Sequence, residues 1–213
     1  MKTDDFIAML AHSTPRTPPA ASARRLGVAL AAGLPVAVLV MVVVLGVRKD
    51  LADAALLPMF WVKLGLPLLL AAAAWWVAER LGRPGVAVQW RWGLVALPVA
   101  LLWLIGGLAY LLAAPAERPG LLFGSTWRTC PLNITMVALP LLLAGLWAMR
   151  GLAPTRPVIA GAAAGAMAGG AGAMVYALHC PEMAAPFLAV WYVLGMALPT
   201  ALGALLGGKL LRW

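Results

Sequence analysis

The chain has 213 residues, of which 64% are hydrophobic and 11% are charged. A core of this size cannot bury so much apolar surface, so the composition excludes a soluble globular protein and indicates an integral membrane protein. Because topology and anionic lipid headgroups account for the net charge of +9, we predict a lipid bilayer as partner and no nucleic acid.

The first 25 residues precede the first long apolar run, so we predict a tail over 1–25 and a transmembrane domain over 26–213. Thr3 can cap a short tail helix whose first turn is acidic and whose remaining surface is apolar. Its candidate binding residues are Asp4, Asp5, Phe6, Ile7 and Leu10. Such a short helix is unstable alone, so it lies on the membrane, orders against a partner protein or stays disordered. The acidic first turn disfavours an anionic membrane and favours the partner.

Six nearly uncharged runs have the length that crosses a bilayer. They cover 26–47, 55–78, 93–114, 132–149, 157–178 and 186–208. Backbone polar groups in lipid must be satisfied within each segment, and the alternating pattern of a membrane β-barrel is absent. The predicted fold class is therefore all-α, a bundle of six transmembrane helices with a short cytoplasmic N-terminal helix.

Lys63 is the one charged residue inside the predicted spans. It lies beside Phe60 and Trp61 near a span end, so we expect its side chain to snorkel to the membrane interface, with a ligand or ion role as the alternative. No Asp or Glu lies in any span, which disfavours a proton- or cation-coupled transporter.

Charge in the short loops predicts the orientation, because Lys and Arg are retained on the cytoplasmic side. An even number of spans puts both termini on one side of the membrane. That side carries eleven basic residues, and the other side carries four. We therefore predict that both termini are cytoplasmic.

Cys130 and Cys180 are the only cysteines, and each precedes a proline at the predicted outer end of a span. Both would face the periplasm or its equivalent, where thiols can persist as a disulfide. A structural disulfide, a reversible sensor and two unrelated buried thiols remain as interpretations. His179 and Glu182 are candidate accessory ligands. Without a motif spacing the metal signal is weak, so we assign no metal beyond transient binding at the cysteines.

Glycines recur every four residues in the fifth span, at Gly161, Gly165 and Gly169, and Gly203 and Gly207 repeat the spacing in the sixth. Such spacing lets helix backbones approach closely. We predict helix contact within the monomer, and a homo-oligomer has no further support.

Enzyme motifs are absent: the chain has no Cys-x-x-Cys, His-Glu-x-x-His, Gly-x-Ser-x-Gly or phosphate-binding loop. We therefore predict no enzyme activity, no catalytic residue and no cofactor.

Four elements of the sequence resemble a known family. They are the opening Met-Lys-Thr-Asp-Asp-Phe-Ile, then Phe60-Trp61-Val62-Lys63, then Thr129-Cys130-Pro131, and finally His179-Cys180-Pro181-Glu182 followed by Trp191-Tyr192 and Gly195-Met196. Over nearly the whole chain the sequence resembles the six-span anti-sigma factors of the NrsF type.

This resemblance implies an anti-sigma factor that uses its N-terminal segment to sequester an extracytoplasmic-function sigma factor at the bacterial inner membrane. It also implies that Cys130 and Cys180 sense oxidants or heavy metals and thereby release the sigma factor. Two rival classes remain. A small transporter or channel would use Lys63 and the glycine-rich fifth span as its path, and a membrane thiol–disulfide enzyme would cycle the two cysteines with a quinone.

Overall fold

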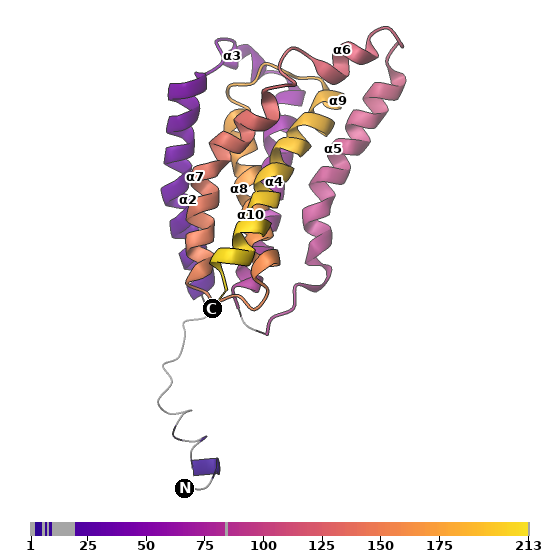
Figure 1. The fold of residues 1–213 in the computed structure, drawn as a ribbon. Helices are drawn as coiled ribbons and strands as arrows, with labels where there is room; N and C mark the ends of the chain where they lie inside the picture. The colour runs from indigo at the N-terminus through magenta and orange to yellow at the C-terminus, as the bar shows by residue number, and fades with distance from the viewer. Residues whose placement is uncertain (1–2, 6, 8, 10–19, 84, 213) are drawn as a thin grey trace.

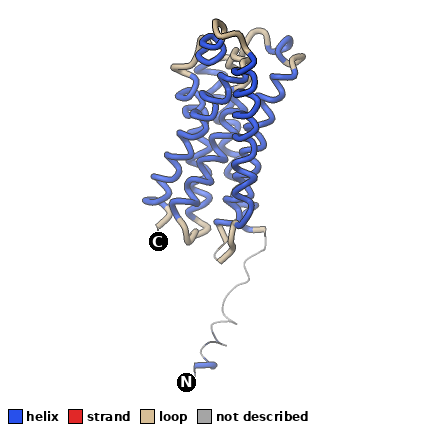
Figure 2. Tube along the Cα trace, turned by 90° about the vertical axis from the view of Figure 1, so that its right-hand side faces the viewer, coloured by secondary structure: helices blue, strands red, loops and turns tan. Residues whose placement is uncertain are grey.

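The computed structural model describes residues 3–5, 7, 9, 20–83 and 85–212. Helices joined by turns and loops make up this described part, and it contains no strand (Figures 1 and 2). The predicted all-α class is therefore confirmed.

Six helical runs of 20 to 26 residues are long and apolar enough to cross a bilayer. They are α2 (Ala21–Val40) with the π-helical η1 (Met41–Leu45), α4 (Pro58–Leu81), η2 (Gln89–Arg91) with α5 (Trp92–Leu112), α7 (Cys130–Arg150), α8 (Pro157–Tyr176), and α9 (Ala185–Phe187) with η3 (Leu188–Tyr192) and α10 (Val193–Leu210). At about 1.5 Å per residue, the shortest run spans about 30 Å, the thickness of the hydrocarbon core. Two short helices, α3 (Leu51–Ala54) and α6 (Arg118–Phe123), lie in the connections.

The six runs correspond one to one with the predicted spans. The largest difference at the start of the bundle is α2, which begins at Ala21, ahead of the predicted boundary at 26. Two arginines that were assigned to the tail, Arg24 and Arg25, therefore belong to the first transmembrane helix.

The helices run alternately up and down, so the bundle has two ends (Figure 1). One end, here called the cysteine end, holds Leu45, Pro58, Leu112, Cys130, Tyr176 and Ala185. The other, here called the basic end, holds Ala21, Leu81, Gln89, Arg150, Pro157 and Leu210. The start of α2 and the end of α10 thus share the basic end (Figure 1).

The central helix is α8, which packs against α10, α4 and α7, whereas α5 lies at the edge of the bundle (Figure 1). Small residues allow this central position. A Cβ atom added at Gly161 would overlap the carbonyl oxygen of Gly203, and one added at Gly165 would overlap that of Pro199. The predicted use of this glycine spacing for helix contact within the monomer is confirmed, and the structure shows that the fifth and sixth spans are the helices in contact.

The described part of the tail is helical at Thr3, Asp4, Asp5, Ile7 and Met9, and these side chains are exposed. Two of the predicted binding residues, Phe6 and Leu10, lie outside the described residues. The exposed Ile7 and Met9 give the described tail an apolar surface without a partner in the bundle.

Candidate functional site

The two cysteines meet at the cysteine end of the bundle. Cys130 is the first residue of α7, and Cys180 follows the last turn of α8. Both are free cysteines with no exposed surface, and both belong to one cluster of buried side chains. Residues fifty positions apart in the sequence therefore share one buried cluster.

Local sequence explains why each cysteine sits at a helix end. Pro131 fits the first turn of α7, where a missing N–H costs nothing, and the Cys130 N–H is satisfied by the carbonyl of Thr126 at 2.9 Å. The Cys180 N–H donates to the carbonyl of Tyr176 at 3.1 Å, and Pro181 then prevents the helix from continuing. Buried Ile134, Tyr192 and other apolar side chains surround the pair.

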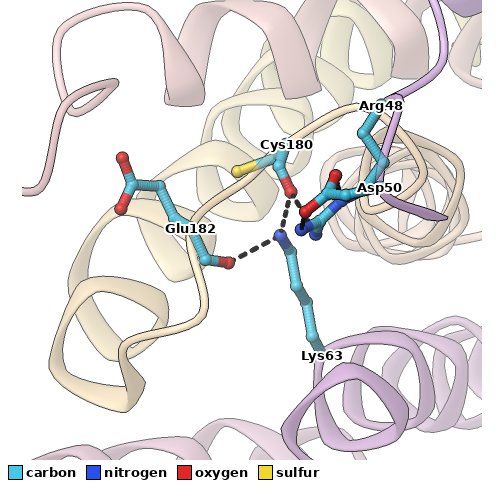
Figure 3. Close-up of polar contacts among 5 residues, drawn as sticks. All are labelled: Arg48, Asp50, Lys63, Cys180 and Glu182. Atoms are coloured by element: carbon cyan, nitrogen blue, oxygen red, sulfur yellow. Dashed lines mark hydrogen bonds and ion pairs between the residues drawn. The ribbon is translucent and has the colours of Figure 1, made fainter. Parts of the chain in front are cut away.

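Lys63 holds the segment that carries Cys180. Its ammonium nitrogen donates to the carbonyl oxygens of Cys180 at 2.6 Å and Glu182 at 2.7 Å (Figure 3). The same nitrogen lies 5.3 Å from the ring centre of Tyr192. The side chain is 1% exposed. The predicted snorkelling of Lys63 to the interface is therefore wrong. Two backbone carbonyls and an aromatic face within the protein replace the water that snorkelling would have provided.

Arg48 reaches the same carbonyl from the loop after η1. Its Nη1 atom donates to the Cys180 oxygen at 3.2 Å, and its backbone N–H donates to Leu178 at 3.1 Å. Asp50 forms an ion pair with the Arg48 guanidinium at 2.7 Å (Figure 3). The hydrogen bond from Arg48 lowers the pKa of Asp50 to about 2, and the same bond raises the pKa of Arg48. Two cations, one from α4 and one from the loop after η1, thus converge on one backbone oxygen.

Glu182 links the two cysteine-bearing segments. One carboxylate oxygen accepts hydrogen bonds from the N–H and the hydroxyl of Ser125, each at 2.7 Å, and from the N–H of Thr126 at 3.2 Å. Partial burial alone would raise the pKa of Glu182, but these donors outweigh it and lower the pKa. Since Thr126 also anchors the Cys130 N–H, the carboxylate of Glu182 joins the Cys180 segment to the turn that starts α7.

His179 points to a different neighbour. Its Nδ1 atom pairs with the carbonyl oxygen of Gly46 at 2.8 Å, and its ring lies 5.5 Å from that of Tyr176. The predicted accessory ligands, His179 and Glu182, thus form hydrogen bonds of their own instead of joining the thiols. Across the described residues, no group of three or more His, Cys, Asp or Glu side chains converges on a metal position.

The environment of Cys180 favours its thiolate. A hydrogen bond from the Cys130 thiol and the nearby Lys63 ammonium lower the pKa of Cys180, and together they outweigh its burial. A thiolate is both the nucleophile of disulfide chemistry and the ligand of soft metal ions. Two free cysteines in one buried cluster can therefore either form a disulfide or share one soft ion.

Comparison with known proteins identifies the family. The chain matches the family model NrsF, described as negative regulator of sigma F, over residues 10–213. The chain belongs to the NrsF family. It is 47% identical over 213 residues to the probable anti-sigma-F factor NrsF of Azospira oryzae, and 40% identical over 215 residues to the anti-sigma-F factor NrsF of Caulobacter vibrioides. Both alignments cover each chain in full, and no solved structure matches.

Sequence reasoning found the cysteines of this NrsF-family chain but missed the groups that hold them. Lys63 was detectable as the single charge inside a span, although its direction was not. Arg48 carried no signal beyond its place in a charged loop, because its partner is a backbone carbonyl 132 positions away.

Proposed function

We propose that this protein is a membrane-bound anti-sigma factor that sequesters an extracytoplasmic-function sigma factor and releases it when Cys130 and Cys180 react with an oxidant or a heavy metal. Full-length similarity to two proteins named as anti-sigma-F factors supports the regulatory role. The observation that carries the sensing role is that two free, buried cysteines share one cluster, with the segment of Cys180 held by Lys63. Sequestration is stoichiometric binding, so the proposal needs no enzyme activity.

The sigma factor binds the tail helix, with Asp4, Asp5, Phe6, Ile7 and Leu10 as its contact residues. The exposure and helical conformation of Asp4, Asp5 and Ile7 support this assignment. An exposed helix with apolar side chains suits a groove on a partner protein, which would bury them.

The basic end and both termini face the cytoplasm of a bacterial inner membrane, and the cysteines face the periplasm. Nine basic residues against one acid near the basic end support this orientation: Arg24, Arg25, Arg80, Arg83, Arg91, Arg150, Arg156, Lys209 and Arg212 against Glu79. The cysteine end is nearly balanced, with Arg48, Lys49, Lys63, Arg118 and Arg128 against Asp50, Asp53, Glu117 and Glu182. Excess Lys and Arg mark the cytoplasmic side.

The signal begins with a change at the two sulfur atoms. Disulfide formation removes two electrons and two protons from the thiols, which a peroxide or a small disulfide accepts, and a soft metal ion displaces protons instead. Either product shifts Cys180, whose carbonyl is bonded to Lys63 of α4. At the other end of α4, Arg83 donates to the hydroxyl of Ser22 at 3.0 Å, at the base of the tail. Helix α4 thus provides a physical link between the thiols and the tail.

For the link to move a mostly bound sigma factor to a mostly free one, the two thiol states must differ by about 5 kcal/mol in sigma-factor binding. A rigid helix that spans the bilayer suits this task better than direct contact, because the two sites are separated by about 30 Å of hydrocarbon.

Co-purification of the sigma factor with the full-length membrane protein tests the proposal. The double substitution Phe6→Ala and Ile7→Ala should abolish co-purification of extracytoplasmic-function sigma factors from the source genome. Leu56→Ala, at an equally apolar and 83% exposed position in the bundle, should leave it unchanged. Undiminished co-purification with the tail variant would overturn the assignment of the tail as the sigma-binding segment.

A further inference from the structure

An open cavity of about 670 Å³ lies at the basic end, between the start of α2 and the end of α7. Its lining combines two arginines with apolar groups: Ala20, Ala21, Arg24, Arg25, Val28, Trp147, Gly151 and Leu152. The cavity is at the opposite end of the bundle from the cysteines, and neither the thiol chemistry nor the tail helix uses it.

Arg25 is fixed in position on one wall of the cavity. Its guanidinium carbon lies 5.2 Å from the ring centre of Trp147, and the group packs so closely on Gly151 that a Cβ atom there would overlap it. The Nε atom of Arg25 is buried and has no hydrogen-bond partner among the described residues. A planar guanidinium that is held by an aromatic face at the wall of a cavity is arranged to receive an anion.

Further positive groups lie on the same wall. Arg24 is exposed and also lines the cavity. Helix α2 begins here without a side-chain cap, so the N–H groups of its first turn have no partner within the helix. None of the described residues that line the cavity is acidic. Arginine pairs and free helix N–H groups are the donors that bind phosphate oxygens.

From the cavity, an apolar surface continues along the outside of α2 and α7 toward the middle of these helices. Val28, Trp147 and Leu143, one helical turn beyond Trp147, are 55%, 62% and 60% exposed on the outer surface of α2 and α7. The charged part of the cavity therefore lies at a span end, where headgroups are found, and the apolar part lies where acyl chains are found.

We propose that this cavity binds the phosphodiester headgroup of an anionic phospholipid, with Arg24 and Arg25 on the phosphate and the acyl chains along Val28, Trp147 and Leu143. Basic pockets between transmembrane helices are suited to anionic headgroups, and the exposed apolar surface below this one distinguishes a lipid from a small soluble anion.

Lipid binding by the purified full-length protein tests the proposal, with native mass spectrometry after titration with phosphatidylglycerol or phosphatidylcholine. The wild-type protein should bind phosphatidylglycerol at least tenfold more tightly. The double substitution Arg24→Gln and Arg25→Gln should reduce this preference to less than twofold. Arg91→Gln is the matched control, because Arg91 also stacks on a tryptophan, Trp90, near the basic end but does not line this cavity.

Arg24→Gln alone guards against misfolding, because that side chain is exposed, and it should still weaken the preference several-fold. An unchanged preference in the arginine variants, or an equal loss in Arg91→Gln, would overturn the proposal. Displacement of the lipid by millimolar inorganic phosphate would show a small-anion site instead. If the Arg24→Gln and Arg25→Gln double variant lost sigma-factor co-purification but kept its lipid preference, the cavity would be reassigned to the protein partner.

Discussion

The two ends of the bundle use charged residues in different ways. At the cysteine end, the charges of Arg48, Lys63 and Glu182 are each bonded to backbone or hydroxyl groups of another segment, and they fix the residues around Cys180. At the basic end, four of the nine basic residues, Arg24, Arg25, Arg83 and Arg156, line cavities, and two residues near that end, Gln89 and Ala153, have positive φ angles of 52° and 46°. The first end is closed and ordered by internal bonds.

This difference teaches how charge can serve two purposes in one small membrane protein. A buried charge that is satisfied by specific carbonyls defines one arrangement of a loop, so chemistry at that loop has a defined starting state. Arg24 and Arg25, by contrast, line a cavity that a ligand from outside the chain can enter. The charges at the cysteine end thus fix the conformation of the loop around Cys180, and those at the basic end suit the binding of a ligand.

Helices α8 and α10 run from one end of the bundle to the other, so breaking their contact should destabilise both ends. Gly165→Ala places a Cβ atom against the carbonyl oxygen of Pro199, and backbone cannot move aside as a flexible side chain can. We expect a loss of about 3 kcal/mol or more in unfolding free energy. Gly107→Ala, where nothing lies within 4 Å of the added atom, is the control. Equal thermal unfolding temperatures in detergent for these two variants would contradict the close packing.

Lys63→Met should loosen the cysteine end alone. The substitution removes two hydrogen bonds and leaves the carbonyls of Cys180 and Glu182 with fewer partners, at a cost of about 2 kcal/mol. Hydrogen exchange over residues 178–184 should accelerate by about thirtyfold, with no change at the start of α2. Lys49→Met, at an exposed neighbouring cation, serves as the control. Exchange at wild-type rates would show that Lys63 does not hold the segment.

Gly124→Ala should disturb the hydrogen bonds by which Glu182 joins the two cysteine-bearing segments. Gly124 has φ of 52°, and an added Cβ atom would lie 2.7 Å from the carboxyl carbon of Glu182. The strain should cost about 1–2 kcal/mol in unfolding free energy. Gly120→Ala in α6, which has open space around it, should be close to neutral. The difference between their unfolding temperatures separates the effect on the Glu182 hydrogen bonds from the general effect of replacing glycine with alanine.

Glu182→Gln should give the smallest effect and one that depends on pH. The folded-state pKa of Glu182 lies below its ordinary value of 4.5, so its carboxylate stabilises the fold fully above that value. This stability is lost as the pH falls through the lowered pKa. The wild-type unfolding temperature should exceed that of Glu182→Gln at pH 7, and the gap should close toward pH 3. A gap that persists unchanged in acid would contradict a role for the charge; Glu117→Gln, at an exposed carboxylate, controls for net charge.

Several features were predictable because they depend on local pattern. Span number and helix class follow from uncharged runs, and close helix contact within the monomer follows from glycines such as Gly161 and Gly165 at four-residue spacing, although the spacing does not name the partner helix. The partners of Lys63 and Arg48 were not predictable, because both donate to backbone carbonyls that leave no trace in residue type. Glu182 illustrates the same limit. Its residue type suggested a ligand, whereas in the structure its carboxylate accepts hydrogen bonds from Ser125 and so joins the two cysteine-bearing segments.

In the proposed mechanism, a change at the thiols alters sigma-factor binding at the opposite side of the membrane. The most direct measurement is release of bound sigma factor from the full-length protein in nanodiscs, before and after a small disulfide oxidant or Cd²⁺. The wild-type protein should release the sigma factor after either treatment, whereas the Cys130→Ser and Cys180→Ser double variant should bind it normally and retain it. Equal release from both proteins, or no release from the wild type after its thiols have demonstrably reacted, would contradict the account.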